Sequence, residues 1–200
     1  MQTFLFALAG YLIGSIPVAY LITHRRHGID LRQTGSRNIG ARNAFEATGN
    51  KCTGFAVLVL DMHKGIIPLV ILAKLEYCDM IPIAAAAIIL GHCYPIWLKF
   101  HGGRGLATAS AIALLVSPAI LLVWIVVYLV TGIIKSQVHI QAFIATFGAL
   151  LFELFTDTNN FFGKGGMLCV GDHLHEAMII ILLIILSRHI EPMYKQLKHS

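Results

Sequence analysis

Charged side chains are scarce in this sequence of 200 residues: only 12% are Asp, Glu, Lys or Arg, whereas 57% are hydrophobic. The mean hydropathy of +0.76 leaves too few polar groups to cover a water-soluble globule. No Gly-Lys-Ser/Thr sequence occurs, which excludes the GxxxxGK[ST] nucleotide-binding loop. Zinc-ligand spacing and a basic domain interleaved with aromatic residues are also missing, so nothing indicates a nucleic-acid partner.

Apolar runs of membrane length recur along the chain. A bilayer core about 30 Å thick needs roughly 20 apolar residues per helix. Proline lacks a backbone donor, so Ser117-Pro118 favours a break within the longest run. The last two runs are short and must extend into flanking polar residues. We expect an all-α polytopic membrane protein with about seven transmembrane helices, forming one domain of residues 1–200. The runs cover residues 3–22, 54–73, 81–98, 106–134, 140–155 and 177–186.

The distribution of Lys and Arg predicts the orientation, because loops rich in these residues stay in the cytoplasm. With seven spans and an external N-terminus, the cytoplasmic segments hold 12 of the 15 basic residues. Only Lys74 and Lys164 then lie outside, and Lys64 falls within a span. The first run has no basic region before it and leads into a basic loop, which favours a retained span over a cleaved signal. The cytoplasmic set is Arg25, Arg26, Arg32, Arg37, Arg42, Lys51, Lys99, Arg104, Lys135, Arg188, Lys195 and Lys198.

Two glycine-rich, cationic segments lie at the ends of apolar runs, and both face the cytoplasm in this topology. Glycine exposes backbone N–H groups and arginine adds charge-assisted donors, so together they suit a phosphate. The alternative is a solvated connector whose charges only set the topology. In the first segment, residues 34–43, the candidate phosphate ligands are Ser36, Arg37, Asn38, Arg42 and Asn43.

The second segment, residues 91–105, combines His92 near the end of the third run with His-Gly-Gly-Arg-Gly before the fourth. Arg104 and Thr108 are one helical turn apart, so we expect them to share a face at a helix start and to form an anion site. His92 is a candidate catalytic residue. A histidine at a membrane boundary also serves as an interfacial hydrogen-bonding group, and this alternative stays open.

Several further polar residues lie within or beside the apolar runs. Asp61 and Lys64 are three residues apart, which predicts a buried pair facing the interior, either functional or purely structural. Cys78 and Cys169 both fall outside and either pair or remain free thiols in apolar surroundings. The sequence Asp-His-Leu-His-Glu at 172–176 is common by chance, so we predict no metal site.

Four segments together resemble the bacterial acyl-phosphate:glycerol-3-phosphate acyltransferase family, in the same order and spacing. They read GSIPVAYLI, IDLRQTGSRNIGARN, LDMHKGIIP and GHCYPIWLKFHGGRGLATA and lie within about the first 110 residues. The resemblance implies a seven-helix enzyme of the bacterial inner membrane with its active site facing the cytoplasm. Such an enzyme moves a fatty acyl group from acyl phosphate to the sn-1 hydroxyl of glycerol 3-phosphate, forming lysophosphatidic acid for phospholipid biosynthesis.

The resemblance also implies roles for individual residues. His92, Ser36 and Asn38 would be catalytic, although the resemblance also allows a substrate phosphate to take the proton of the glycerol hydroxyl. The substrate-binding residues that match the family are Gly40, Asn43, Gly102, Gly103, Gly105, Thr108 and His189. Arg37, Arg42 and Arg104 join this set from their own chemistry, as charge-assisted donors to phosphate. Five positions depart from the family's pattern: Arg37 replaces glycine, Arg42 threonine, Glu46 arginine, Arg104 lysine and Pro192 asparagine. A serine-rich stretch near Ser136 is not clearly present. Because Arg42 and Glu46 are four residues apart, we expect them to pair in a helical turn and Arg42 to supply the missing positive charge.

The partners implied are acyl phosphate, glycerol 3-phosphate and membrane lipid, with neither a cofactor nor acyl-CoA. An acyl phosphate has a good leaving group, so aligning two anionic substrates and neutralising charge suffices without an acyl-enzyme. We expect a monomer. Two alternatives remain open: a small transporter or channel for phosphorylated anions, and an inactive homologue.

Overall fold

The computed structural model describes residues 1–134, 137–156, 167–169 and 171–198, and within these ranges the regular elements are all helical. Three residues discussed above, Lys135, Ser136 and Lys164, lie outside the described residues. Short 3₁₀ turns flank α5: η1 (Cys78–Met80) and η2 (Ile96–Leu98). The α-helices are α1 (Gln2–Gly14), α2 (Val18–His27), α3 (Ala41–Thr48), α4 (Lys51–Lys74), α5 (Ile81–Cys93), α6 (Leu106–Val116), α7 (Pro118–Ile134), α8 (Val138–Thr156) and α10 (Leu174–Lys198).

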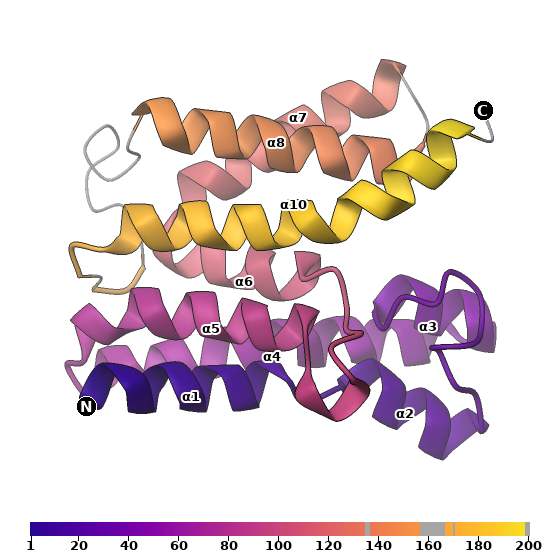
Figure 1. The fold of residues 1–200 in the computed structure, drawn as a ribbon, viewed down its shortest axis with the longest axis horizontal. Coiled ribbons are helices and arrows are strands. Elements are labelled where there is room, and N and C mark those ends of the chain that lie inside the picture. The colour runs from indigo at the N-terminus through magenta and orange to yellow at the C-terminus, as the bar shows by residue number, and fades with distance from the viewer. Residues whose placement is uncertain (135–136, 157–166, 170, 199–200) are drawn as a thin grey trace.

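Most of the helices run along one common axis, with the two termini at opposite ends of the bundle (Figure 1). Helix α1 packs against α5, α5 against α10, α10 against α8, and α8 against α7, while α4 contacts α3, α5 and α6. The short helices α2 and α3 lie at the end where α5 finishes and α6 begins (Figure 1). This arrangement brings the two glycine-rich segments to the same end of the molecule.

Five helical stretches are long and apolar enough to cross a membrane: Gln2–His27, Lys51–Lys74, Cys78–Leu98, Val138–Thr156 and Leu174–Lys198. The first of them comprises α1 and α2. Helices α6 and α7 are apolar but shorter, and the 11 residues of α6 extend only about 16 Å at 1.5 Å per residue. The expected all-helical membrane architecture is therefore confirmed, with two of the seven expected segments shorter than an ordinary span.

Proline marks the interruptions of the first apolar run and of the longest one. The break predicted at Ser117-Pro118 is confirmed, because α6 ends at Val116 and α7 begins at Pro118. The first run is not one continuous helix: α1 ends at Gly14 and α2 begins only at Val18. Pro17 cannot donate a backbone hydrogen bond, which explains this interruption. The short last runs extend into polar sequence as expected, to Thr156 in α8 and Lys198 in α10.

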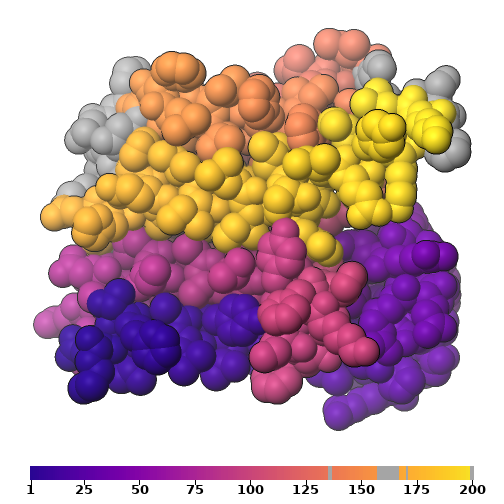
Figure 2. Space-filling view, in the orientation of Figure 1, coloured from indigo at the N-terminus to yellow at the C-terminus, as the bar shows by residue number. Residues whose placement is uncertain are grey.

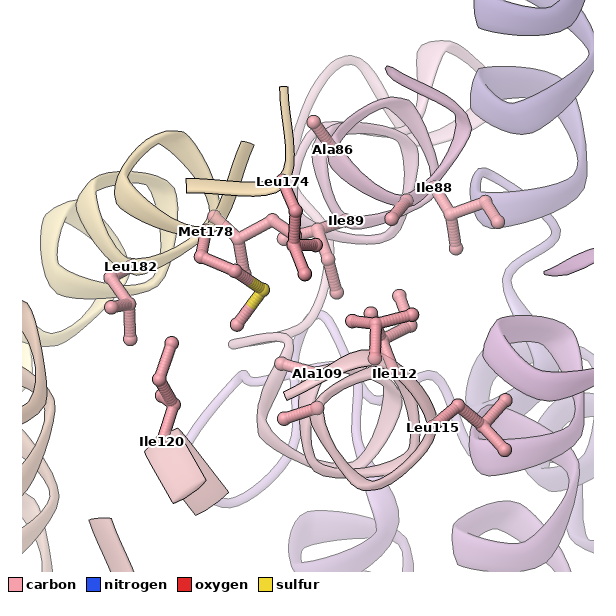
Figure 3. Packing of buried hydrophobic residues seen from close by; sticks show 14 of the residues in the cluster. Ala86, Ile88, Ile89, Ala109, Ile112, Leu115, Ile120, Leu174, Met178 and Leu182 are labelled. Atoms are coloured by element: carbon pink, nitrogen blue, oxygen red, sulfur yellow. The ribbon is translucent and has the colours of Figure 1, made fainter. Parts of the chain in front are cut away.

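Alanine, isoleucine and leucine side chains fill the core between α5, α6 and α10. Figure 3 shows Leu182 of α10 facing Ile120 of α7. Many large apolar side chains remain exposed on the outside of the helices, including Phe4, Phe55 and Leu122. An exposed apolar exterior is the surface that lipid contacts in a membrane protein.

Glycine lets α1 approach α5 closely, which fixes the end of α5. A Cβ atom on Gly14 would lie 2.0 Å from the carbonyl oxygen of Ile88, and one on Gly91 would lie 2.1 Å from that of Tyr11. Small residues at helix contacts allow such backbone approach in membrane bundles. Because Gly91 precedes His92, this contact fixes the backbone position of the histidine.

A disulfide bond joins Cys78 and Cys169 at the opposite end of the bundle, across a separation of 91 residues. Of the two alternatives left open by the sequence, the structure thus has the paired form. Nearby, His175 of α10 contacts the buried carboxylate of Glu153 in α8, with 3.1 Å between Nδ1 and Oε1. Among the described residues, no group of three or more His, Cys, Asp and Glu side chains is placed to hold a metal.

Candidate functional site

Asn43 organises the loop that carries the first glycine-rich segment. Its side chain is 1% exposed, and its Nδ2 group donates to the carbonyl oxygens of Asn38 at 2.9 Å and Thr34 at 3.1 Å. Its Oδ1 atom accepts from the backbone N–H of Ser36 at 3.0 Å. The amide of Asn43 is thus used within the protein, and its contact with a substrate would be indirect. Glycine at position 35 leaves room for the Asn43 side chain, because a Cβ there would lie 2.3 Å from Asn43 Oδ1.

The remaining candidates of this segment surround the folded loop. Ser36 and Arg37 are exposed, whereas Asn38 and Gly40 are partly buried. Arg37 has a φ of 58°, in the left-handed region where the family's usual glycine would be unstrained. Gly40 is the N-cap of α3, where its chain is extended. The loop therefore presents Ser36 and Asn38 at the surface beside the start of α3.

The predicted pair between Arg42 and Glu46 is confirmed in α3. The Nε atom of Arg42 lies 2.7 Å from Oε1 of Glu46, and both side chains are substantially exposed, at 58% and 44%. Because ion pairs in water contribute little to stability, this contact orients the guanidinium more than it stabilises the fold.

His92 lies at the end of α5 and is held against the second glycine-rich segment. Its carbonyl oxygen accepts from the N–H of Gly103 at 3.1 Å, and the carbonyl of Cys93 accepts from Gly102 at 3.1 Å. A Cβ atom on Gly103 would lie 2.2 Å from His92 Nε2 and 2.7 Å from the carbonyl oxygen of Ile39. Gly103 therefore joins the two glycine-rich segments at the histidine ring, as the phosphate-site hypothesis requires.

Buried charges lie directly behind His92. The Nζ atom of Lys64 is 2.9 Å from Oδ1 of Asp61, which confirms the predicted i,i+3 pair, and the two side chains are 8% and 3% exposed. The same Asp61 oxygen lies 3.7 Å from Nδ1 of His92. Lys64 also donates to the carbonyl oxygen of Ile16, in the break between α1 and α2. The pair thus links α4 to the interrupted first run and to the histidine.

Arg104 and Thr108 do not share a helix face, so that expectation is wrong. Gly105 adopts a left-handed conformation with a φ of 80° and α6 begins only at Leu106, which leaves Arg104 outside the helix. Thr108 points to α4 and donates to the carbonyl oxygen of Asp61 at 2.8 Å. Arg104 points to α8, where its Nη1 atom is 3.1 Å from Nδ1 of His139.

Arg104 stands among other cations. Burial, together with the positive charges of Arg188 and Arg42, lowers the pKa of Arg104 to about 10, so the guanidinium remains charged at neutral pH. Glu46 and Glu191 oppose this shift more weakly. The positive charges of Arg188 and Arg42 both repel that of Arg104, and this local excess of positive charge favours an anion.

Arg188 belongs to this site and was considered from the sequence only as a topological charge. Its Nη2 atom donates to the carbonyl oxygen of Gly102 at 2.9 Å and its Nε atom to that of Gly103 at 3.3 Å. The guanidinium lies 5.2 Å from the ring centre of Tyr94, a cation–π distance. The available signal was its position beside His189 at the end of the last apolar run.

His189 is buried next to this cluster, with 1% exposure, and its Nδ1 atom donates to the carbonyl oxygen of Ile185 at 2.8 Å. Pro192, which replaces the family's asparagine, lies inside α10, and the C-terminal part of α10 bends away from the rest of the helix in Figure 1. Figure 2 shows the segment around residue 100, in pink, between α1 and the violet α2–α3 region. The second glycine-rich segment is therefore held between the N-terminal helices and α10.

A small polar cavity lies beside His92, with Asp61, Lys64, Ile39 and Gly103 among its lining residues. A second, apolar pocket lies between α6, α7 and α10. Its lining runs from Leu106 and Ile185, near the arginine cluster, to Trp124. The polar cavity offers charged and hydrogen-bonding groups, and the apolar pocket offers mainly hydrocarbon contacts.

Comparisons with known proteins find the same family over most of the chain. The family model for glycerol-3-phosphate acyltransferase matches residues 4–199. A glycerol-3-phosphate acyltransferase of Pelagibacter ubique (strain HTCC1062) is 40% identical over 146 residues, which cover 73% of this chain and 75% of that protein. One of Fusobacterium nucleatum subsp. nucleatum is 31% identical over 191 residues, covering 94% and 91%.

Solved structures show the same likeness. The crystal structure of PlsY (YgiH), an integral membrane glycerol 3-phosphate acyltransferase, in its glycerol 3-phosphate form has a TM-score of 0.80 at 32% identity, covering 100% of this chain and 94% of that chain. The lysophosphatidic acid form of that protein has a TM-score of 0.78 at 31% identity, covering 100% and 93%.

Proposed function

Because the chain belongs to the glycerol-3-phosphate acyltransferase family, we propose that it transfers a fatty acyl group from acyl phosphate to the sn-1 hydroxyl of glycerol 3-phosphate. The product is lysophosphatidic acid. The observation that carries this proposal is the cluster of Arg42, Arg104 and Arg188, which Arg188 links to the glycine-rich segment that packs against His92. Both substrates are phosphate anions, and such a cluster would neutralise them while the histidine meets the reacting hydroxyl.

The arginines would divide the work of phosphate binding. Arg104 has a planar fork of donors, which can contact two phosphate oxygens at once where the family's usual lysine contacts one. Arg42 is fixed by Glu46 at the first turn of α3 and reaches out from the protein. Arg188 already donates to Gly102 and Gly103, so its role would be to shape the loop and add charge.

The apolar pocket between α6, α7 and α10 suits the acyl chain. Leu106 and Ile185 lie at the end of the pocket nearest Arg104 and Arg188 in sequence, so a chain lodged there would carry its acyl phosphate head at the cluster. Lipid tails are as apolar as this lining, so the pocket would align the chain by packing and not by a hydrophobic transfer energy. Substrate would enter from surrounding membrane lipid.

The chemistry asks little beyond alignment and charge. An acyl phosphate is a mixed anhydride whose phosphate leaves readily, so the hydroxyl can attack the carbonyl carbon directly. Charge develops on the departing phosphate, where the arginines would stabilise it. The catalytic residues would be those inferred from the sequence. Ser36 and Asn38 lie at the surface of the loop, and His92 lines the polar cavity.

The finer setting of the enzyme is also part of the proposal. We expect seven spans in one domain, an external N-terminus, and a site facing the cytoplasm of a bacterial inner membrane, because 12 of 15 basic residues fall on that side. We expect the protein to act as a monomer without a cofactor.

The test is acyl transfer by the purified protein in detergent or nanodiscs, supplied with an acyl phosphate and labelled glycerol 3-phosphate. The expected result is labelled lysophosphatidic acid and released inorganic phosphate. Acyl-CoA serves as the control donor and should give no product. An inactive homologue would form none with either donor, and a transporter would instead move labelled glycerol 3-phosphate into proteoliposomes.

A further inference from the structure

The hydroxyl of Thr108 determines which nitrogen of His92 carries the proton. Its Oγ1 atom lies 2.8 Å from the carbonyl oxygen of Asp61, and a carbonyl can only accept, so the single hydroxyl proton of Thr108 is used there. The same Oγ1 atom lies 3.4 Å from Nδ1 of His92. Since Thr108 has no second proton to give, Nδ1 must be the donor in this contact.

The charge distribution favours the same tautomer. Oδ1 of Asp61 lies 3.7 Å from Nδ1 of His92, so its negative charge attracts a proton on that nitrogen. Lys64 holds this carboxylate in place from the other side, at 2.9 Å. All of these groups are buried in the contact between α4, α5 and α6, with Thr108 0% and Asp61 2% exposed.

A proton on Nδ1 leaves the lone pair on Nε2. This atom faces Gly103, where a Cβ would lie only 2.2 Å away, and both residues line the polar cavity. We propose that Thr108 and Asp61 are positioning residues that hold His92 with its proton on Nδ1, so that Nε2 accepts the proton of the substrate hydroxyl. This inference rests on the proposed acyl transfer and assigns the buried Asp61–Lys64 pair to the reaction.

The hydroxyl oxygen of glycerol 3-phosphate forms a bond to the acyl carbon, and the bond from that carbon to the phosphate oxygen breaks. The phosphate leaves with the bonding pair, and the hydroxyl proton passes to Nε2. The resulting imidazolium is stabilised by Asp61, and the proton then passes to the released phosphate.

Three variants separate positioning from structure. Thr108→Val keeps the shape but removes the acceptor for Nδ1–H, and Thr108→Ser restores it. Orientation of a general base contributes a part of its 10²–10⁴-fold effect, so we expect Thr108→Val to lower kcat about tenfold with KM for glycerol 3-phosphate nearly unchanged. Thr108→Ser should recover most of the loss. Thr131→Val is the matched control and should keep wild-type kcat, because the Thr131 hydroxyl donates within its own helix, to the carbonyls of Val127 and Tyr128.

A second measurement needs no turnover. Nitrogen-15 NMR of histidine-labelled protein, with the His92 signals identified by their loss in His92→Gln, reports the tautomer directly. We expect Nδ1–H in the wild type and a mixture in Thr108→Val. If Thr108→Val does not fold, the double variant Asp61→Asn with Lys64→Met tests the same network without leaving an unpaired buried charge.

The outcomes are distinct. An Nε2–H tautomer in the wild type, wild-type kcat in Thr108→Val, or equal losses in Thr108→Val and Thr108→Ser would each overturn the positioning role. Absence of any acyl transfer by the wild-type protein would instead overturn the proposed function, while the tautomer would still be measured.

Discussion

Gly103 and His92 are so close that no side chain fits between them. The Gly103 N–H donates to the His92 carbonyl oxygen at 3.1 Å, and its missing side chain leaves the space that Nε2 occupies. The carbonyl of Ile39 closes the other side of this space. A backbone contact between two segments that are far apart in sequence therefore decides where the imidazole lies.

The first prediction concerns Gly103→Ala. The new methyl group must displace the His92 ring or the Ile39 carbonyl, and a misplacement of about 1 Å at a reacting group can cost up to about 10²-fold. We expect kcat to fall at least about tenfold, measured by steady-state acyl transfer, with the thermal midpoint recorded alongside. Gly132→Ala in α7 is the control, because a Cβ there meets nothing closer than 3.6 Å and activity should be kept. Wild-type kcat in folded Gly103→Ala would show that the contact is not needed.

Arg42 and Glu46 form an exposed pair, so substitutions there should change substrate binding and leave the stability of the fold unchanged. The second prediction is that Arg42→Ala raises KM for glycerol 3-phosphate or acyl phosphate about tenfold, the cost of about one charge-assisted hydrogen bond to phosphate. Glu46→Arg should be tolerated or should lower KM, because it adds a cation where the family has one. If the kinetics of Arg42→Ala match the wild type for both substrates, Arg42 only sets the topology and Arg104 is the principal anion ligand.

At the scale of helices, the features that could be predicted are those that depend on neighbouring residues in the sequence. The break at Pro118 and the pairing of Asp61 with Lys64 follow from one missing donor and from helical spacing. The left-handed Gly105 was not predicted, and it turned Arg104 and Thr108 toward different helices. Glycine permits that conformation without requiring it, so only the tertiary contacts select it.

The role of Arg188 could not be predicted for a related reason. Its acceptors are backbone carbonyls 85 and 86 positions earlier in the chain, and a carbonyl leaves no trace in a sequence pattern. The family resemblance indicated the segments and their residues, but the contact between α10 and the second glycine-rich segment appears only in three dimensions.

The third prediction follows from that contact. Arg188→Lys keeps the charge but cannot donate to Gly102 and Gly103 as a planar fork, so the loop should loosen. We expect KM for glycerol 3-phosphate to rise several-fold, in line with the net loss of about 1 kcal/mol for a hydrogen bond. Faster amide exchange of residues 101–105, read by mass spectrometry, should accompany it. Lys195→Arg on the same helix is the control, because Lys195 pairs with the exposed Glu191 one turn away. Unchanged amide exchange in Arg188→Lys would show that Arg188 does not hold Gly102 and Gly103 in place.

The disulfide belongs to the opposite end of the helices, away from the site. The fourth prediction is that Cys78→Ser lowers the thermal midpoint without lowering kcat by more than about twofold. Closing a long loop stabilises a protein by typically about 2–4 kcal/mol, and this loop spans 91 residues. Cys52→Ser, at an exposed free thiol, should leave both quantities unchanged. A large loss of kcat in folded Cys78→Ser would mean that the two ends of the bundle are coupled.

Over the whole molecule, the chemistry is divided between the two ends of one bundle. The arginines, His92 and both glycine-rich segments gather where α5 ends and α6 begins, whereas the disulfide joins the start of α5 to the segment before α10. Disulfides persist in oxidising compartments and basic residues stay in the cytoplasm, so the two features indicate opposite sides of a membrane independently.

The last prediction uses the native cysteines to test that orientation. Of the four, Cys78 and Cys169 are bonded to each other, Cys93 is buried and Cys52 is exposed at the start of α4, so Cys52 is the only accessible thiol. A membrane-impermeant maleimide should therefore label inside-out vesicles and leave right-side-out vesicles unlabelled. Cys52→Ser should abolish the labelling.

A mild, impermeant reductant added first to right-side-out vesicles should make two further thiols reactive from outside, because Cys78 and Cys169 would then be exposed to that compartment. Both experiments follow from one arrangement, in which the arginine cluster faces the cytoplasm, where glycerol 3-phosphate would reach it, and the disulfide faces outward. Labelling of Cys52 in sealed right-side-out vesicles would reverse the orientation. Labelling of Cys52 and the reduced cysteines from the same side would instead show that the two ends of the bundle do not lie on opposite sides of the membrane.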